Sequence, residues 1–234
     1  MCLLHEDRNR GETGFSRDRS LPWISRPLSR LALDLICRRI KLPPSIPPGD
    51  RHMNSQSIIV PQISAYPGRE ARARLILRWL VKLNVVEPEL TTCGRTYNKM
   101  AYAIAPGARA VVENPDALPF GQPVNGLEIV TKRCIFTPLK DFAEEAGCPE
   151  CRKEIGEALF DSLEEWMPGH TDNFMCPECR HEDDINGFLF LQPCGFSDLG
   201  FIFNDWLDAS FKPGFVADFA ERLDRPVSFV KVRL

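Results

Sequence analysis

Two copies of the four-residue sequence Cys-Pro-Glu-Cys constrain this chain more than any other feature. They place Cys148 and Cys151 on one tight turn and Cys176 and Cys179 on another. The proline inside each copy fixes φ for its turn and helps to leave backbone N–H groups directed at the sulfurs. Two such turns that face each other supply four thiolates, which is the ligand set of a tetrahedral metal site. The sequence therefore predicts a metal site built from these four cysteines.

Zinc is the ion that this ligand set favours. Four thiolates leave no open position for a substrate, so the predicted role of the ion is structural. Iron in a rubredoxin-like site uses the same four sulfurs and stays open as an alternative. Thioredoxin-type redox chemistry fits less well, because it needs one reactive pair beside a βαβ unit. His170 and His181 lie close in sequence and could replace a cysteine, but we expect both on the surface.

With this doubled motif the chain resembles the zinc-ribbon superfamily, whose four ligand positions match Cys148, Cys151, Cys176 and Cys179. The resemblance covers residues 147–190 and implies a structural zinc held between two knuckles. The chain departs from the pattern in two ways. Its spacer of 24 residues between the pairs is longer than the usual 15 to 20. An arginine also follows each knuckle, where zinc ribbons usually carry glycine.

Arg152 and Arg180 are those two arginines, and each is expected to strain its backbone if the position needs a positive φ. Each also places a cation beside a site whose four thiolates and one zinc ion total about −2. The longer spacer is explained by a helix over 154–166, followed by an extended return segment that can bring the knuckles together. The apolar residues of this helix share one face: Ile155, Leu159, Leu163 and Trp166.

Residues 1–52 differ in character from the rest of the chain. Arginines are scattered without a period, six prolines occur, and no sustained helix or strand pattern develops. The segment carries a formal charge of +4, whereas the remainder carries −7. A basic tail that contacts nucleic acid or a partner would fit this charge. We expect instead a disordered or non-native extension, with Met53, four residues before the first clear strand pattern, as the initiator.

The region after Met53 has the pattern of an α+β domain. Strands are expected at 57–64, 99–104, 127–138, 187–193, 195–206 and 226–234, and helices at 69–82 and 213–223. This order resembles a ferredoxin-like βαββαβ core interrupted by an inserted zinc ribbon with one helix between its knuckles. The predicted division is a core formed by 53–140 and 187–234, and an acidic zinc-ribbon insert at 141–186.

The net charge of the predicted ribbon distinguishes between nucleic-acid binding and protein binding, two functions that zinc ribbons serve. Residues 141–184 contain fourteen Asp/Glu and three Lys/Arg, a formal charge of −11, which is opposite in sign to a surface that binds nucleic acid. Nucleic-acid binding is therefore disfavoured unless the basic helix 69–82, with Arg74, Arg78 and Lys82 in one row, makes the contact. We expect a zinc-binding protein whose acidic ribbon is a structural or protein-interaction module that docks on a basic protein surface.

Motifs of catalysis are absent from the sequence. The chain has no phosphate-binding loop, no dinucleotide fingerprint and no hydrolase signature, so we predict no catalytic residue, and a metal-dependent enzyme of unknown reaction is the weakest interpretation. Cys93 and Cys134 are expected to be small buried side chains. Metal-type cysteine spacing fits a reducing compartment, and no apolar run is long enough for a membrane span, so we expect a cytoplasmic protein.

Overall fold

The computed structural model describes residues 55–94, 100–138 and 142–233. The predictions for residues 1–52 and for Met53 lie outside these ranges. The helices and strands in chain order are β1 (Ser55–Pro61), α2 (Arg69–Lys82), β2 (Val86–Thr91), β3 (Ala101–Ile104), β4 (Leu127–Val130), β5 (Cys134–Phe136), β6 (Ala146–Gly147), α3 (Gly156–Asp161), α4 (Leu163–Trp166), β7 (Asn173–Met175), β8 (Glu182–Asp184), β9 (Leu189–Phe190), β10 (Gly195–Ser197), β11 (Gly200–Asn204), α5 (Pro213–Leu223) and β12 (Val227–Arg233).

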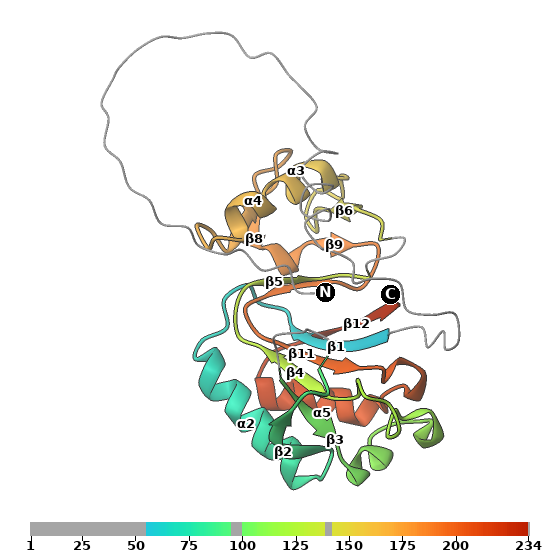
Figure 1. Ribbon diagram of the computed structural model, residues 1–234. Helices are drawn as coiled ribbons and strands as arrows, with labels where there is room; N and C mark the ends of the chain where they lie inside the picture. Colours follow the sequence, from blue (N-terminus) through green and yellow to red (C-terminus); the bar gives the residue numbers. More distant parts are fainter. Residues whose placement is uncertain (1–54, 95–99, 139–141, 234) are drawn as a thin grey trace, which may run out of the picture.

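A six-stranded sheet forms the centre of the larger part of the protein (Figure 1). Its strand order is β12-β1-β11-β4-β3-β2, and every neighbouring pair is antiparallel. Strand β1 is buried along its whole length, as expected for a short continuous apolar run bounded by polar residues. The prediction of a mixed α and β fold with a mostly antiparallel sheet is therefore confirmed.

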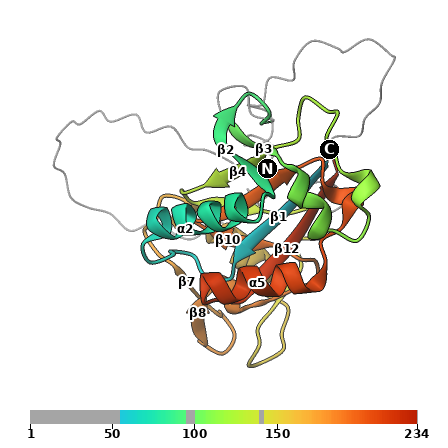
Figure 2. The same ribbon diagram turned by 90° about the horizontal axis from the view of Figure 1, so that it is seen from below.

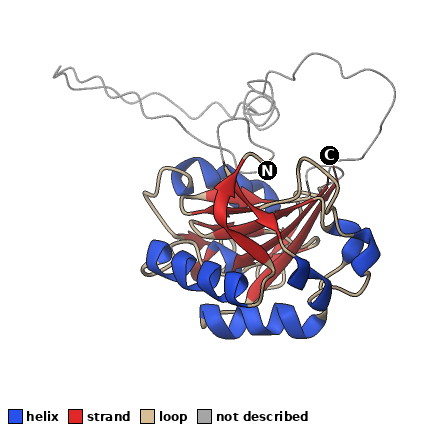
Figure 3. Ribbon diagram, turned by 60° about the horizontal axis from the view of Figure 1, so that its bottom comes forward, coloured by secondary structure: helices blue, strands red, loops and turns tan. Residues whose placement is uncertain are grey.

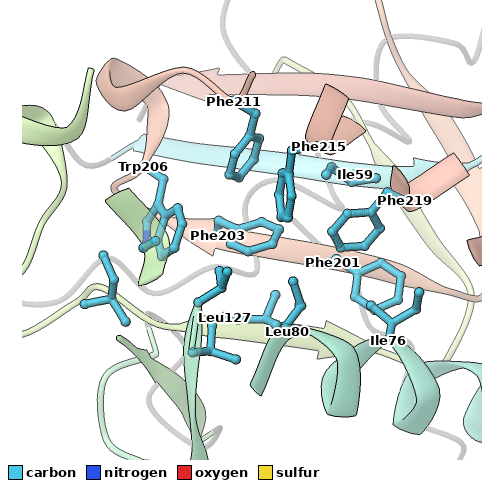
Figure 4. Close-up of a cluster of buried hydrophobic side chains, with 14 of the residues drawn as sticks. Ile59, Ile76, Leu80, Leu127, Phe201, Phe203, Trp206, Phe211, Phe215 and Phe219 are labelled. Carbon is cyan, nitrogen blue, oxygen red and sulfur yellow. The ribbon is translucent and has the colours of Figure 1, made fainter. Parts of the chain in front are cut away.

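Helices α2 and α5 lie across one face of this sheet (Figures 2 and 3). Each turns an apolar stripe at helical spacing toward the strands: Ala73, Ile76 and Leu80 in α2, and Phe215, Phe219 and Leu223 in α5. The stripes meet Phe201 and Phe203 of β11 in the main hydrophobic core (Figure 4). The Phe219 ring contacts Phe201 edge to face with centroids 5.2 Å apart, a geometry that favours aromatic packing. In the described part of the chain, no helix is both long and apolar enough to cross a membrane.

The opposite face of the sheet is covered by a two-stranded arm made of β5 and β10. Strand β4 leads into β5, and β10 leads into β11, but β5 and β10 pair with each other in a sheet of their own. The single strands expected over 127–138 and over 195–206 are therefore each two strands in two sheets, which corrects both predictions. Phe136 of the arm packs with Ile58 and Val60 of β1 in a second apolar cluster. Helices, sheet and arm thus form three successive layers (Figure 1).

Gly200 allows the arm to approach the sheet closely, because a Cβ at this position would overlap the tip of the Phe136 ring. We expect Gly200→Ala to lower the free energy of unfolding by about 1–3 kcal/mol, the usual cost of overpacking, as measured by urea denaturation. Gly214→Ala is the matched control, since nothing lies within 4 Å of a Cβ there and the substitution favours helix α5. Equal losses for the two variants would contradict the close approach.

Residues 142–194, which we call the distal module, lie beyond the end of the arm (Figure 1). They contain helices α3 and α4 and two small antiparallel sheets, β6 with β9 and β7 with β8. Their apolar residues form a separate cluster in which Leu159, Trp166 and Phe174 pack together with Phe196 of the arm. The distal module therefore has its own small core and rests on the arm through that core.

The helix predicted over 154–166 is correct in place but wrong in continuity. It is divided at Ser162 into α3 and α4. The Ser162 hydroxyl donates a hydrogen bond to the Leu159 carbonyl at 2.6 Å. A short polar side chain that binds nearby backbone in this way competes with the helical hydrogen-bond pattern. Apolar spacing alone does not register this competition, so the pattern predicts one helix where the chain forms two.

Candidate metal centre

The four cysteines that the sequence singled out meet at one point of the distal module. Their sulfur atoms all lie within 4.8 Å of one another. Cys148 Sγ is 3.6 Å from Cys179 Sγ, and Cys151 Sγ is 3.8 Å from Cys176 Sγ. A tetrahedron with zinc–sulfur bonds of about 2.3 Å places its sulfurs about 3.8 Å apart, so these spacings suit such an ion. The predicted convergence is confirmed, and the cluster is compatible with a zinc site.

The two knuckles share one backbone hydrogen-bond pattern. In the first knuckle the Arg152 N–H donates to the Cys148 carbonyl at 3.0 Å, and the Cys148 N–H donates to the Lys153 carbonyl at 3.0 Å. The corresponding bonds of the second knuckle measure 2.9 and 2.8 Å. Each turn is therefore closed on itself before any ion is considered. Repetition of the same turn explains how two short copies of one sequence present their sulfurs in matching orientation.

Arg152 and Arg180 end the two turns with φ values of 60° and 63°. These values lie in the left-handed region, where a residue with a Cβ is less stable than glycine by about 1 kcal/mol. The expectation of backbone strain at both positions is confirmed. Both side chains are exposed, so neither arginine compensates for this strain by burying apolar surface.

Arg180→Gly is expected to increase the stability of the metal-loaded protein by about 0.5–1 kcal/mol, because glycine adopts the required φ without strain. Thermal unfolding of the loaded protein measures the change. Arg180→Ala is the control, since it removes the same exposed side chain but keeps the Cβ. A gain for alanine equal to that for glycine would show that the backbone angle is not the cause.

The thiols of the second knuckle differ in acidity. Burial raises the pKa of Cys176, but the N–H groups of Cys179 and Glu178 and the neighbouring thiols outweigh it and lower this pKa to about 7. For Cys179 the N–H of His181 lowers the pKa, whereas desolvation and the other three thiols raise it to about 12. Neighbouring thiols of the cluster therefore lose their protons at different pH values. A divalent cation that binds all four sulfurs as thiolates displaces the remaining protons.

Ser64, a buried residue after β1, connects the distal module to the rest of the protein. Trp166 Nε1–H donates to Ser64 Oγ at 2.8 Å, and the Ser64 hydroxyl donates to the Asp172 carbonyl at 3.2 Å. The Ser64 N–H donates to Asp184 Oδ2 at 2.8 Å. Asp184 ends β8, which pairs with β7, the strand that leads into Cys176. These hydrogen bonds thus link the loop between β1 and α2 to the β7–β8 hairpin, whose first strand leads into the second knuckle.

Arg133, which precedes β5, holds the end of α4. Its guanidinium donates to the carbonyls of Trp166 at 2.6 Å and Thr171 at 2.9 Å, and forms an ion pair with Asp172. It also lies 4.8 Å from the centre of the Trp166 ring, within the range of a cation–π contact. Charge-assisted bonds of a sheltered arginine are stronger than those of an exposed surface pair, and this side chain is only 15% exposed.

Sequence reasoning identified neither Ser64 nor Arg133. Their partners are remote in the chain, since Ser64 is 102 residues from Trp166 and Arg133 is 33 residues from it. No motif spacing signals such contacts. His170 and His181, which were weighed as substitute ligands, are not members of the four-residue cluster.

The other cysteines singled out by the sequence are structural. Cys93 is buried, and its thiol donates to the Ala101 carbonyl at 3.3 Å. Cys134 is buried in β5. Both side chains are buried, as predicted, but Cys134 is disulfide-bonded and is therefore not a free small hydrophobic side chain. Cys194 is also buried, and burial raises the pKa of its thiol to about 12, which keeps it protonated and unreactive.

The basic row of α2 is directed to solvent, since Arg74, Arg78 and Lys82 are all exposed. In the described part of the chain, no ion pair joins this row to a carboxylate of the distal module. The opposite charges of the two regions therefore do not neutralise each other through direct ion pairs.

Comparison with protein-family models, with curated proteins and with solved structures finds no match to this chain. The metal assignment consequently depends on the four sulfurs and on the repeated turn that presents them.

Proposed function

We propose that this chain is a zinc-binding protein in which four cysteines hold an acidic zinc ribbon, predicted at residues 141–186, on an α+β core predicted at 53–140 and 187–234. Residues 187–194 pack with the ribbon as part of the distal module. The observation that carries the proposal is the approach of four sulfurs to within 4.8 Å of one another. Four thiolates leave no position for a substrate, so the ion contributes to folding rather than to chemistry. Bound zinc would keep all four cysteines deprotonated and the two knuckles together.

A ferredoxin-like core is part of this proposal. The order β12-β1-β11-β4 with antiparallel neighbours supports it, because α2 follows β1 and α5 connects β11 with β12. The pair β2–β3 then extends the sheet beyond β4. A cytoplasmic location also belongs to the proposal, since cysteines in metal-type spacing fit a reducing compartment.

Cobalt substitution tests the metal assignment. Cobalt(II) added to the metal-free protein is expected to give the visible absorption of a tetrahedral four-sulfur site at one ion per chain, and zinc is expected to displace it. A spectrum typical of octahedral cobalt would refute the proposal. If the isolated protein retains iron that zinc does not displace, the metal held by the four cysteines is iron rather than zinc.

The acidic ribbon supports a role in binding another protein. Its exposed carboxylates include Glu150, Glu157 and Glu164, and the basic row of α2 does not pair with the distal module in the described structure. Such a surface complements a basic protein surface, with an association rate that falls as salt rises. The formal charge of −11 over 141–184 opposes contact between this ribbon and nucleic acid.

Cross-linking in nuclease-treated host lysate tests the interaction. Replacing the three ribbon glutamates by glutamine is expected to abolish a specific cross-linked partner that carries a basic surface. The matched control replaces three exposed glutamates of the α+β domain by glutamine and is expected to retain the partner. These are Glu87, Glu89 and Glu113. Loss of the partner in both variants would contradict a role for the ribbon. Loss of the complex on nuclease treatment alone would favour the nucleic-acid alternative through α2.

A further inference from the structure

The four cysteines of the metal centre differ in their access to solvent. Cys148 and Cys176, the first cysteine of each knuckle, are both 0% exposed. Cys151 is half-buried, and Cys179 is exposed. Each knuckle therefore has one cysteine that a small dissolved molecule reaches and one that is closed to solvent.

Accessible and buried sulfurs face each other across the two knuckles. Cys179 Sγ lies 3.6 Å from Cys148 Sγ, and Cys151 Sγ lies 3.8 Å from Cys176 Sγ. Each of these contacts joins the accessible cysteine of one knuckle to the buried cysteine of the other. A disulfide bond is about 2.05 Å long, so each pair needs to approach by only about 1.5–1.8 Å to form one.

The metal-loaded cluster has the chemical form that peroxides oxidise. Loaded with zinc as proposed above, the protein holds all four sulfurs as thiolates. The thiolate, rather than the thiol, is the nucleophile in cysteine chemistry, and its susceptibility to oxidation follows its exposure. Cys179 is consequently the sulfur that we expect to react first, with a second thiolate 3.6 Å away to complete the reaction.

We propose that this cluster is a site of reversible oxidation by hydroperoxides, at which two disulfides between the knuckles take the place of the ion. The disulfides are Cys148–Cys179 and Cys151–Cys176. This inference rests on the proposed zinc site and adds a second state to it, in which the knuckles are joined covalently and the ion is released.

The chemistry needs one peroxide for each disulfide. The Cys179 thiolate attacks one peroxide oxygen, the O–O bond breaks, and hydroxide leaves while the sulfur becomes a sulfenic acid. The Cys148 thiolate then attacks that sulfur, the S–O bond breaks, and a second hydroxide leaves. Two electrons pass from the two sulfurs to the peroxide. Cys151 and Cys176 repeat these steps, and a dithiol reductant reverses both disulfides by thiol–disulfide exchange.

Oxidation therefore differs from the loss of a ligand. The first disulfide joins the knuckles while the ion is still held by the other two sulfurs, so the second pair stays opposed. When the ion leaves, both knuckles remain linked. We expect the oxidised, zinc-free distal module to resist proteolysis, unlike a module that loses its zinc without forming disulfides.

Treatment of the full-length, zinc-loaded protein with hydrogen peroxide tests the proposal, after its metal content has been measured. A colorimetric zinc indicator is expected to report release of one ion per chain. Glu150 separates the two cysteines of the first knuckle, and Glu178 separates those of the second. Cleavage by trypsin and by a glutamate-specific protease therefore places each of the four cysteines on its own peptide. Mass spectrometry is expected to find the two disulfides between the knuckles, and dithiothreitol with zinc is expected to restore one ion per chain.

Cys194→Ala is the matched control, because it removes another buried thiol of the same apolar cluster and leaves the four sulfurs in place. It is expected to release zinc at an unchanged rate and to form the same disulfides. Loss of either disulfide in this variant would make Cys194 the resolving thiol and overturn the assignment.

Other results would also overturn the inference. These are zinc retained in excess peroxide, disulfides within a knuckle, sulfinic acids in place of disulfides, or zinc binding that dithiothreitol does not restore. Each leaves the zinc site itself standing, because the metal content is measured before peroxide is added. Protein that holds no metal at that first measurement would instead refute the proposed zinc site, and this inference with it.

Discussion

Cys176→Ser protein is expected to lose its metal and the folded structure of the distal module together. A serine hydroxyl does not replace a thiolate ligand at neutral pH, and binding of a structural zinc contributes on the order of 10–16 kcal/mol in small zinc domains. The small apolar cluster of residues 142–194 has no comparable source of stability. Metal analysis measures the ion, and limited proteolysis with mass spectrometry is expected to show cleavage within 142–194 while the six-stranded sheet stays protected.

Cys194→Ala is the matched control for this result. Cys194 is buried in the same apolar cluster as Cys176, but it lies outside the group of four sulfurs. This variant is expected to keep one ion per chain and a protease-resistant distal module. Full metal content in Cys176→Ser, or equal metal loss in both variants, would show that the four-sulfur cluster does not hold the ion.

Trp166→Ala is expected to lower the free energy of unfolding by about 3–5 kcal/mol, the usual cost of deleting a buried tryptophan. Trp166 is 1% exposed and meets the Phe196 ring edge to face with centroids 5.9 Å apart. It also donates to Ser64 and lies under the Arg133 guanidinium. One substitution therefore removes three contacts between the distal module and the rest of the protein. Denaturant unfolding, with metal content measured on the same samples, checks the effect.

Trp166→Phe separates the hydrogen bond from the packing. It keeps most of the aromatic surface but loses the bond to Ser64, so we expect a loss of about 1–2 kcal/mol. Both Trp166 variants are expected to keep their metal, because the tryptophan is not a ligand. If Trp166→Ala is as stable as Trp166→Phe, the attachment of the distal module does not depend on the packing of the tryptophan ring. Loss of metal in either would make Trp166 part of the metal centre.

The sequence was most informative where a pattern is complete within a short stretch. The four cysteines, the left-handed arginines and the helices α2 and α5 each depend on residues close together in the chain, and the structure has them where they were predicted. The arm was missed because the three polar residues Thr131, Lys132 and Arg133 were included in one strand, and no glycine or proline marks the change of sheet between Val130 and Cys134. Ser64 and Arg133 were missed because their partners are set by tertiary packing.

The arm has a mechanical consequence for the metal centre. A module on a single flexible linker swivels freely, but here two hydrogen-bonded strands lead out to the distal module and back from it, and both continue into neighbouring strands of the main sheet. Paired strands resist twisting, so the main sheet sets the orientation of the distal module.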